Sequence, residues 1–238
     1  MKLFLLFVIC SLLSACASHA PIAGKSIPQR GDRSAANQLA KTDFDRMADV
    51  ELAENTQSLR NLMLKLYKRN PHELAKSTSD DAQKMTEWVF ESALQHQWQF
   101  KEIGNKQGTD AIFLSFDANY QNDRVLAFIV GLQTMLAKAH GGKTDFYLTD
   151  KIEPQHIYNV ARNIEIATWK LSNARDKGGK LYLLTNEISD KDRNLSFERE
   201  FGKMIGRTDL YAIALAEKSQ RLISRVMQSL ATAAFLPF

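Results

Sequence analysis

The chain has 238 residues, of which 45% are hydrophobic and 24% charged, and its 31 basic and 27 acidic side chains give a formal net charge of +4. This length fits one globular domain or two small ones, with enough apolar content to bury a sizeable core. The basic residues alternate with acidic ones along the chain, so the small positive charge does not favour nucleic-acid binding.

The first fifteen residues are organised like an export signal. Met1 and Lys2 form a short positive segment, and the apolar run at residues 3–13 is shorter than the roughly 20 residues that cross a bilayer. This run ends in Leu13-Ser14-Ala15-Cys16, which resembles the lipobox of bacterial lipoproteins. The resemblance implies that residues 1–15 are removed and that Cys16 is acylated. The alternative is an ordinary secretory signal, cut at Ala15 or Ala17.

The resemblance also implies a location. In lipoproteins an Asp after the acylated cysteine favours the inner membrane, whereas Ala17 follows Cys16 here. We therefore expect a lipid anchor in the outer membrane, facing the periplasm, with the inner membrane as the alternative. Two or more acyl chains hold such a protein stably on the bilayer. The other cysteine, Cys10, lies in the leader, so the processed chain would have no free thiol.

Residues 16–42 are predicted to be the lipidated cysteine and a flexible linker. The segment contains two prolines and two glycines and shows no apolar period. A flexible chain of this length has a root-mean-square span of roughly 28 Å. We expect one folded periplasmic domain at residues 43–238.

Helical spacing of apolar residues dominates that domain and predicts a mainly α fold, a bundle of about six to eight helices. Cap residues at Thr42, Asn70 and Asp80 predict three helix starts. The third helix is expected to end near Trp98, two central buried helices are expected within residues 109–140, and another follows Pro154. The last two are predicted at residues 196–205 and 208–234, with Gly206 between them. No apolar run is long enough for a membrane span.

A short two-stranded element is also predicted. Residues 141–149 and 178–185 both begin with Gly-Gly-Lys and both follow a predicted helix. The segments 144–149 and 181–185 contain residues suited to strands and could pair beside the bundle. Two similar helix exits without strands are the alternative.

Motifs that carry chemistry are largely lacking. The sequence has no phosphate-binding glycine loop, no His-Glu-x-x-His and no Gly-x-Ser-x-Gly. Its five histidines lie far apart, so we expect no metal site and no cofactor, and we assign no catalytic residue. The charged run at residues 186–200 could supply paired carboxylates for hydrolysis, but a solvated loop and a helix start explain it equally well.

Two apolar features leave alternatives open. Six aromatic residues could line a ligand groove or could simply pack in the core; they are Trp88, Trp98, Trp169, Tyr158, Tyr182 and Tyr211. The apolar tail at residues 231–238 could dock on the bundle or form an exposed patch for a partner.

Three classes of function fit these observations. The first is a non-catalytic interaction, assembly or scaffold lipoprotein of the envelope, bound to the bilayer through Cys16 and to a protein partner. The second is a carrier or sensor of an apolar ligand, which requires a cavity of several hundred cubic ångströms. The third is an envelope hydrolase, which requires two carboxylates facing one cleft. An enzymatic role is the less favoured expectation.

Overall fold

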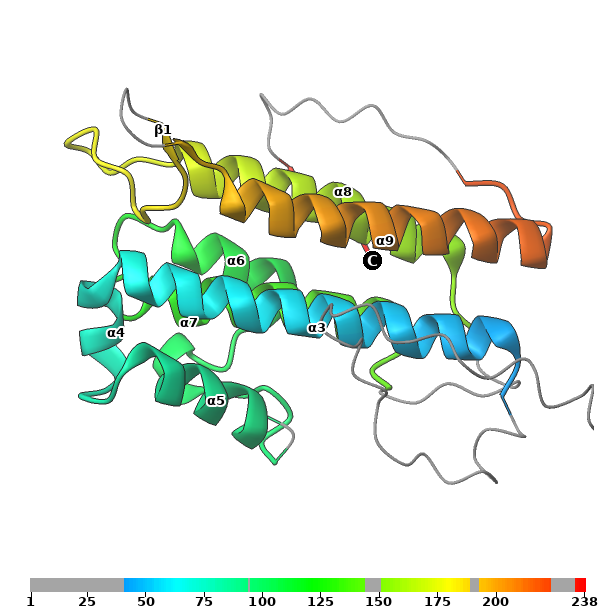
Figure 1. The fold of residues 1–238 in the computed structure, drawn as a ribbon, viewed down its shortest axis with the longest axis horizontal. Helices are drawn as coiled ribbons and strands as arrows, with labels where there is room; N and C mark the ends of the chain where they lie inside the picture. Colours follow the sequence, from blue (N-terminus) through cyan, green and yellow to red (C-terminus); the bar gives the residue numbers. More distant parts are fainter. Residues whose placement is uncertain (1–40, 94, 144–150, 189–192, 224–233) are drawn as a thin grey trace, which may run out of the picture. The chain divides into compact units, whose positions relative to one another are not determined.

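The computed structural model describes residues 41–93, 95–143, 151–188, 193–223 and 234–238 (Figure 1). The predicted leader, Cys16 and all but the last two residues of the predicted linker lie outside these ranges. The described residues form seven α-helices, one 3-10 turn and a two-stranded antiparallel sheet. The expected helical bundle with a short two-stranded element is therefore confirmed. None of the described helices combines the length and the apolar character that a membrane crossing needs.

The long helix α3 (Asp43–Arg69) begins at the predicted cap. The Thr42 hydroxyl accepts a hydrogen bond from the Asp45 backbone at 3.2 Å, and the Asp45 carboxylate accepts one from the Thr42 backbone at 2.7 Å. This reciprocal capping box satisfies amides that a helix start otherwise leaves unbonded. Lys41, just before the cap, forms a buried ion pair with Asp49 at 2.6 Å, so the fold already includes residues of the predicted linker.

Helices α4 (Pro71–Ser77), α5 (Ala82–Ser92) and α6 (Gly108–Ser115) follow, with a 3-10 turn at Lys101–Ile103 between the last two. The prediction that the third helix reaches Trp98 was wrong, since α5 ends at Ser92. Gln97 and Trp98 have φ angles of +53° and +60°, in the left-handed region that a continuing α-helix cannot use.

Helix α7 (Arg124–Ala139) is the centre of the core and is buried along almost its whole length. Phe128 is fully buried and meets Phe116 and Phe201 edge-to-face, with ring centroids 5.8 and 6.3 Å apart. Gly131 lets α6 approach closely, because a Cβ there would lie 2.6 Å from Cγ1 of Ile112. The expectation of a central buried helix here is confirmed.

Helix α8 (Pro154–Asn173) packs along α9 (Ser196–Ser219), and α3 contacts both α7 and α9 (Figure 1). The prediction that Gly206 separates two helices was wrong, because α9 runs through it. A glycine inside a helix costs about 1 kcal/mol relative to alanine, and burial of Phe201, Met204 and Tyr211 on either side offsets that cost. The helix ends at Ser219, well before residue 234; residues 224–233 lie outside the described ranges.

The two-stranded sheet pairs β1 (Glu187–Ile188) with β2 (Arg193–Asn194) in antiparallel register. It therefore lies a few residues beyond the predicted segment 181–185, in which Leu181 forms an isolated bridge with Arg175. The predicted partner segment, residues 144–149, lies outside the described ranges. Backbone groups of Leu184 are instead bonded by the buried Asn70 side chain, at 2.7 and 2.9 Å.

The tail at residues 234–238 docks on the bundle, which was one of the two expectations for it. Phe235 and Phe238 are partly buried against the core. The side chain of Asn163 on α8 forms two hydrogen bonds with the backbone of Leu236.

Candidate functional site

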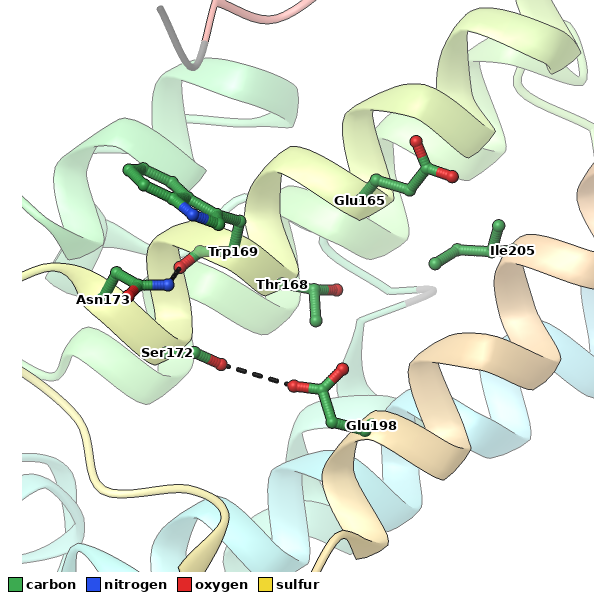
Figure 2. A pocket seen from close by; sticks show the side chains of 7 residues that line it. All are labelled: Glu165, Thr168, Trp169, Ser172, Asn173, Glu198 and Ile205. Carbon is green, nitrogen blue, oxygen red and sulfur yellow. Dashed lines mark hydrogen bonds between the residues drawn. The ribbon is translucent and has the colours of Figure 1, made fainter. Parts of the chain in front are cut away.

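A pocket of about 270 Å³ lies between α8 and α9. Figure 2 shows the seven side chains that line it: Glu165, Thr168, Trp169, Ser172, Asn173, Glu198 and Ile205. Its volume is just below the range of about 300–1,000 Å³ that is typical of small-molecule sites. Its size alone therefore does not favour a carrier of an apolar ligand.

The two carboxylates of this pocket have separate partners. The Glu198 carboxylate accepts hydrogen bonds from the Asn186 amide at 3.0 Å and from the Ser172 hydroxyl at 3.4 Å. The Glu165 carboxylate lies 3.2 Å from the Arg162 guanidinium. Figure 2 shows the Glu198 carboxylate directed at Ser172, whereas the Glu165 carboxylate points away from Ser172. Acid–base hydrolysis needs two carboxylates aimed at one bond, which this arrangement does not supply.

The charge at Glu165 depends on a neighbouring pair. Burial raises the pKa of the Glu165 carboxyl, Arg162 opposes that shift, and the nearby Asp209 carboxylate adds to it. Arg162 also bonds Asp209 on α9. The ion pair between Arg162 and Glu165 therefore forms part of a three-residue link between α8 and α9.

Carboxylates of the charged run at residues 186–200 are likewise dispersed. Glu187 pairs with Arg69 at 3.0 Å, Glu198 faces the α8/α9 pocket, and Glu200 pairs with Lys203 at 2.9 Å. Asp190 and Asp192 lie outside the described residues. The described part of the run therefore forms the two short strands and the start of α9, and its described carboxylates do not face one another as a pair.

A buried polar cluster that the sequence did not reveal connects α3, α7 and α9. The Glu51 carboxylate accepts hydrogen bonds at 2.6 Å from both the Asn55 amide and the Thr208 hydroxyl. Its second oxygen lies 3.0 Å from Nε2 of His140, whose ring stacks on Tyr211 with centroids 5.8 Å apart. All of these side chains are almost fully buried.

The protonation of His140 follows from these contacts. Burial by itself would lower the pKa of the imidazole, but the Glu51 carboxylate and the Leu136 carbonyl, 2.8 Å from Nδ1, outweigh burial and raise it. When each ring nitrogen carries a proton, Nε2 donates to the Glu51 carboxylate and Nδ1 donates to the Leu136 carbonyl. Because solvent does not reach the pair, we interpret this cluster as a structural network rather than a reactive site.

The six aromatic residues do not form one groove. Trp88 on α5 and Trp169 on α8 are 48% and 37% exposed, whereas Tyr211 is buried. Trp98 packs edge-to-face on Phe90, and Tyr182 stacks under the Arg124 guanidinium. Nor do the described residues contain a group of three or more His, Cys, Asp or Glu side chains able to hold a metal ion.

The solvent face of α9 is unusual for a surface helix. It contains Gly202, Gly206, Leu210 and Ile213, at spacings of four, four and three, and the last two are 61% and 44% exposed. A Cβ built at either glycine would have no described neighbour within 4 Å. Contacts among the described residues thus give no reason for these glycines or for the exposed apolar side chains beside them.

Comparisons of the chain with protein families, with curated proteins and with solved structures found no match.

Proposed function

We propose that the protein is a non-catalytic interaction lipoprotein of the bacterial envelope. Acylated Cys16 anchors it to the periplasmic face of the outer membrane, and its helical domain holds a protein partner. The observation that carries this proposal is the exposed apolar face of α9, formed by Gly202, Gly206, Leu210 and Ile213. We call these four residues the α9 face.

The α9 face has the composition of a helix-docking surface. Glycines spaced four apart on one face leave a shallow track that lets another backbone approach closely. Leu210 and Ile213 continue that track with apolar side chains that the chain itself leaves exposed. Each glycine costs the isolated helix about 1 kcal/mol, and a partner helix that packs against it would recover that cost.

A photo-crosslinking amino acid at Leu210 tests the proposal. We expect one discrete adduct with an envelope protein in intact cells, and the same probe at the exposed Glu87 on α5 serves as the control. Adding Gly202→Ala and Gly206→Ala should abolish the adduct while stabilising the folded chain by about 0.5–1 kcal/mol per site. An adduct that survives both substitutions, or equal adducts at both probe positions, would contradict the proposal.

The anchor is tested separately. Cys16→Ala removes the thiol that is to be acylated, so we expect an unprocessed or mislocalised precursor. Labelling of cells with a clickable palmitate should mark the wild type alone. A labelled variant would show that the lipid is not carried by Cys16.

A further inference from the structure

Residues 235–238 contact side chains of α6, α7 and α8, and we call the site that they occupy the groove. Phe235 contacts Phe113 of α6 edge-to-face, with ring centroids 4.9 Å apart. The Phe238 ring lies under the Lys138 ammonium of α7, 5.2 Å from the ring centroid. A Cβ at Gly108 would come within 3.2 Å of the same ring, so this glycine leaves room for it.

Two asparagines of α8, one turn apart, bind the backbone of this tail. Oδ1 of Asn163 accepts a hydrogen bond from the Leu236 amide at 2.6 Å, and its Nδ2 donates to the Leu236 carbonyl at 2.8 Å. Nδ2 of Asn159 donates to the Pro237 carbonyl at 2.7 Å. Gln155 donates to Oδ1 of Asn159 at 2.8 Å and so fixes the orientation of that amide.

These bonds recognise an extended main chain rather than particular side chains. Peptide recognition by β-strand addition works in a similar way: backbone hydrogen bonds provide the affinity, and pockets for side chains provide the selectivity. Here the selective positions are two aromatic rings three residues apart. Any extended segment with that spacing can make the contacts that Phe235 and Phe238 make.

The tail covers polar side chains of the groove. Asn163 is fully buried and Asn159 is 7% exposed with the tail in place. If the tail left, the Asn163 amide would lose its two bonds to Leu236, and the Asn159 amide would lose its bond to Pro237. The tail itself makes a small contact, since Ala234 and Pro237 remain exposed.

The tail brings no acidic side chain to the two lysines of the groove. Lys138 and Lys170 place their ammonium groups over the rings of Phe238 and Phe113, at 5.2 and 5.5 Å from the centroids. The chain has no acidic residue after Glu217. A segment with the same aromatic spacing and acidic flanks would keep every contact of the tail and add attraction to these two lysines.

We propose that the groove of α6, α7 and α8 is a peptide-binding site for an extended, acid-flanked segment of a partner protein with aromatic residues at positions i and i+3, and that residues 235–238 occupy it as a displaceable intramolecular competitor. The site is independent of the α9 face, so the two proposals stand or fall separately.

Fluorescence anisotropy of a labelled peptide, DEAFLPFDE, with the purified full-length protein tests this inference. In a variant with Phe235→Ala and Phe238→Ala, the tail competes poorly, so we expect binding at least tenfold tighter than to the wild type. Adding Asn163→Ala to that variant should weaken binding at least tenfold, whereas Asn173→Ala, on the same helix but away from the groove, should leave it unchanged. A peptide with N-methylated leucine lacks the N–H that would donate a hydrogen bond to Oδ1 of Asn163, and it should bind at least tenfold more weakly than the unmodified peptide.

Circular dichroism of each variant shows whether it is folded, and the N-methylated peptide probes the same contact without any change to the protein. The inference is overturned if the variant with Phe235→Ala and Phe238→Ala does not bind the peptide, or if the N-methylated peptide binds as tightly as the unmodified one. It is also overturned if a second copy is the true occupant, in which case light scattering would show a wild-type dimer that dissociates when both tail phenylalanines are replaced.

Discussion

Replacing Phe128 by alanine tests the organisation of the core most directly. The side chain is fully buried on α7, between the edges of Phe116 and Phe201. Burial of such a side chain is worth about 1.5–3 kcal/mol, and the cavity left behind raises the cost of a Phe→Ala change to about 3–5 kcal/mol. Because two aromatic contacts of about 0.5–1.5 kcal/mol each disappear as well, we expect a loss near the upper end of that range.

Urea unfolding followed by circular dichroism measures this loss in the purified protein. Phe113→Ala is the matched control, because this phenylalanine is 46% exposed on α6 and its truncation should cost at most about 1.5 kcal/mol. A loss below about 1 kcal/mol for Phe128→Ala, or one no larger than that of the control, would refute the assignment of α7 as the core.

Three further perturbations follow from the contacts described above. The pKa of the His140 imidazole is raised above its usual 6.5 in the fold, so its stabilising contribution is fully present below pH 6.5 and is lost as the pH rises through the folded pKa. In urea unfolding, the wild type should exceed His140→Gln in stability by more at pH 6 than at pH 9. A difference that does not change with pH would contradict this expectation. Gly131→Ala forces a Cβ to within 2.8 Å of backbone atoms of α6 and should destabilise the fold by about 1–3 kcal/mol. Gly202→Ala should instead stabilise the fold. If thermal unfolding showed a change of the same sign for both variants, the packing described here would be contradicted. Lys41→Met removes one charged partner of the Asp49 carboxylate, in a site where both side chains are at most 1% exposed, and it should cost about 3–5 kcal/mol in urea unfolding. An unchanged free energy of unfolding would show that Lys41 contributes nothing to the fold.

Features encoded by neighbouring residues were predictable from the sequence. The start of α3 follows from a cap and an acid three residues apart, Thr42 and Asp45, and the start of α4 follows from Pro71. The central burial of Phe128 follows from an apolar run with helical spacing. In each case the determining groups lie within a turn or two, so the pattern is independent of the rest of the chain.

Features that depend on distant contacts were not predictable. Gly206 has the local preference of a helix end, and only packing of its neighbours on α3 and α8 keeps α9 continuous. The Glu51–His140 contact joins residues far apart in sequence, and the local bonds of these two residues, to Asn55 and to the Leu136 carbonyl, do not predict it. The groove around the tail was equally hidden, because Asn159 and Asn163 on a helix face look like ordinary surface residues.

The bonds of Glu51 have a consequence for the order in which the chain can fold. Its hydrogen bond with Thr208 closes a loop of 157 residues, whereas α6 and α7 are separated by only a short connection. Local pairs form early and distant ones late, because closing a long loop costs more entropy. As the chain is synthesised from its N-terminus, helices α3 to α7 can meet first, and Glu51 then has Asn55 and His140 as partners but lacks the Thr208 hydroxyl. The polar network around Glu51 is therefore completed only when α9 arrives, so any chain cut short before Thr208 would leave this network incomplete.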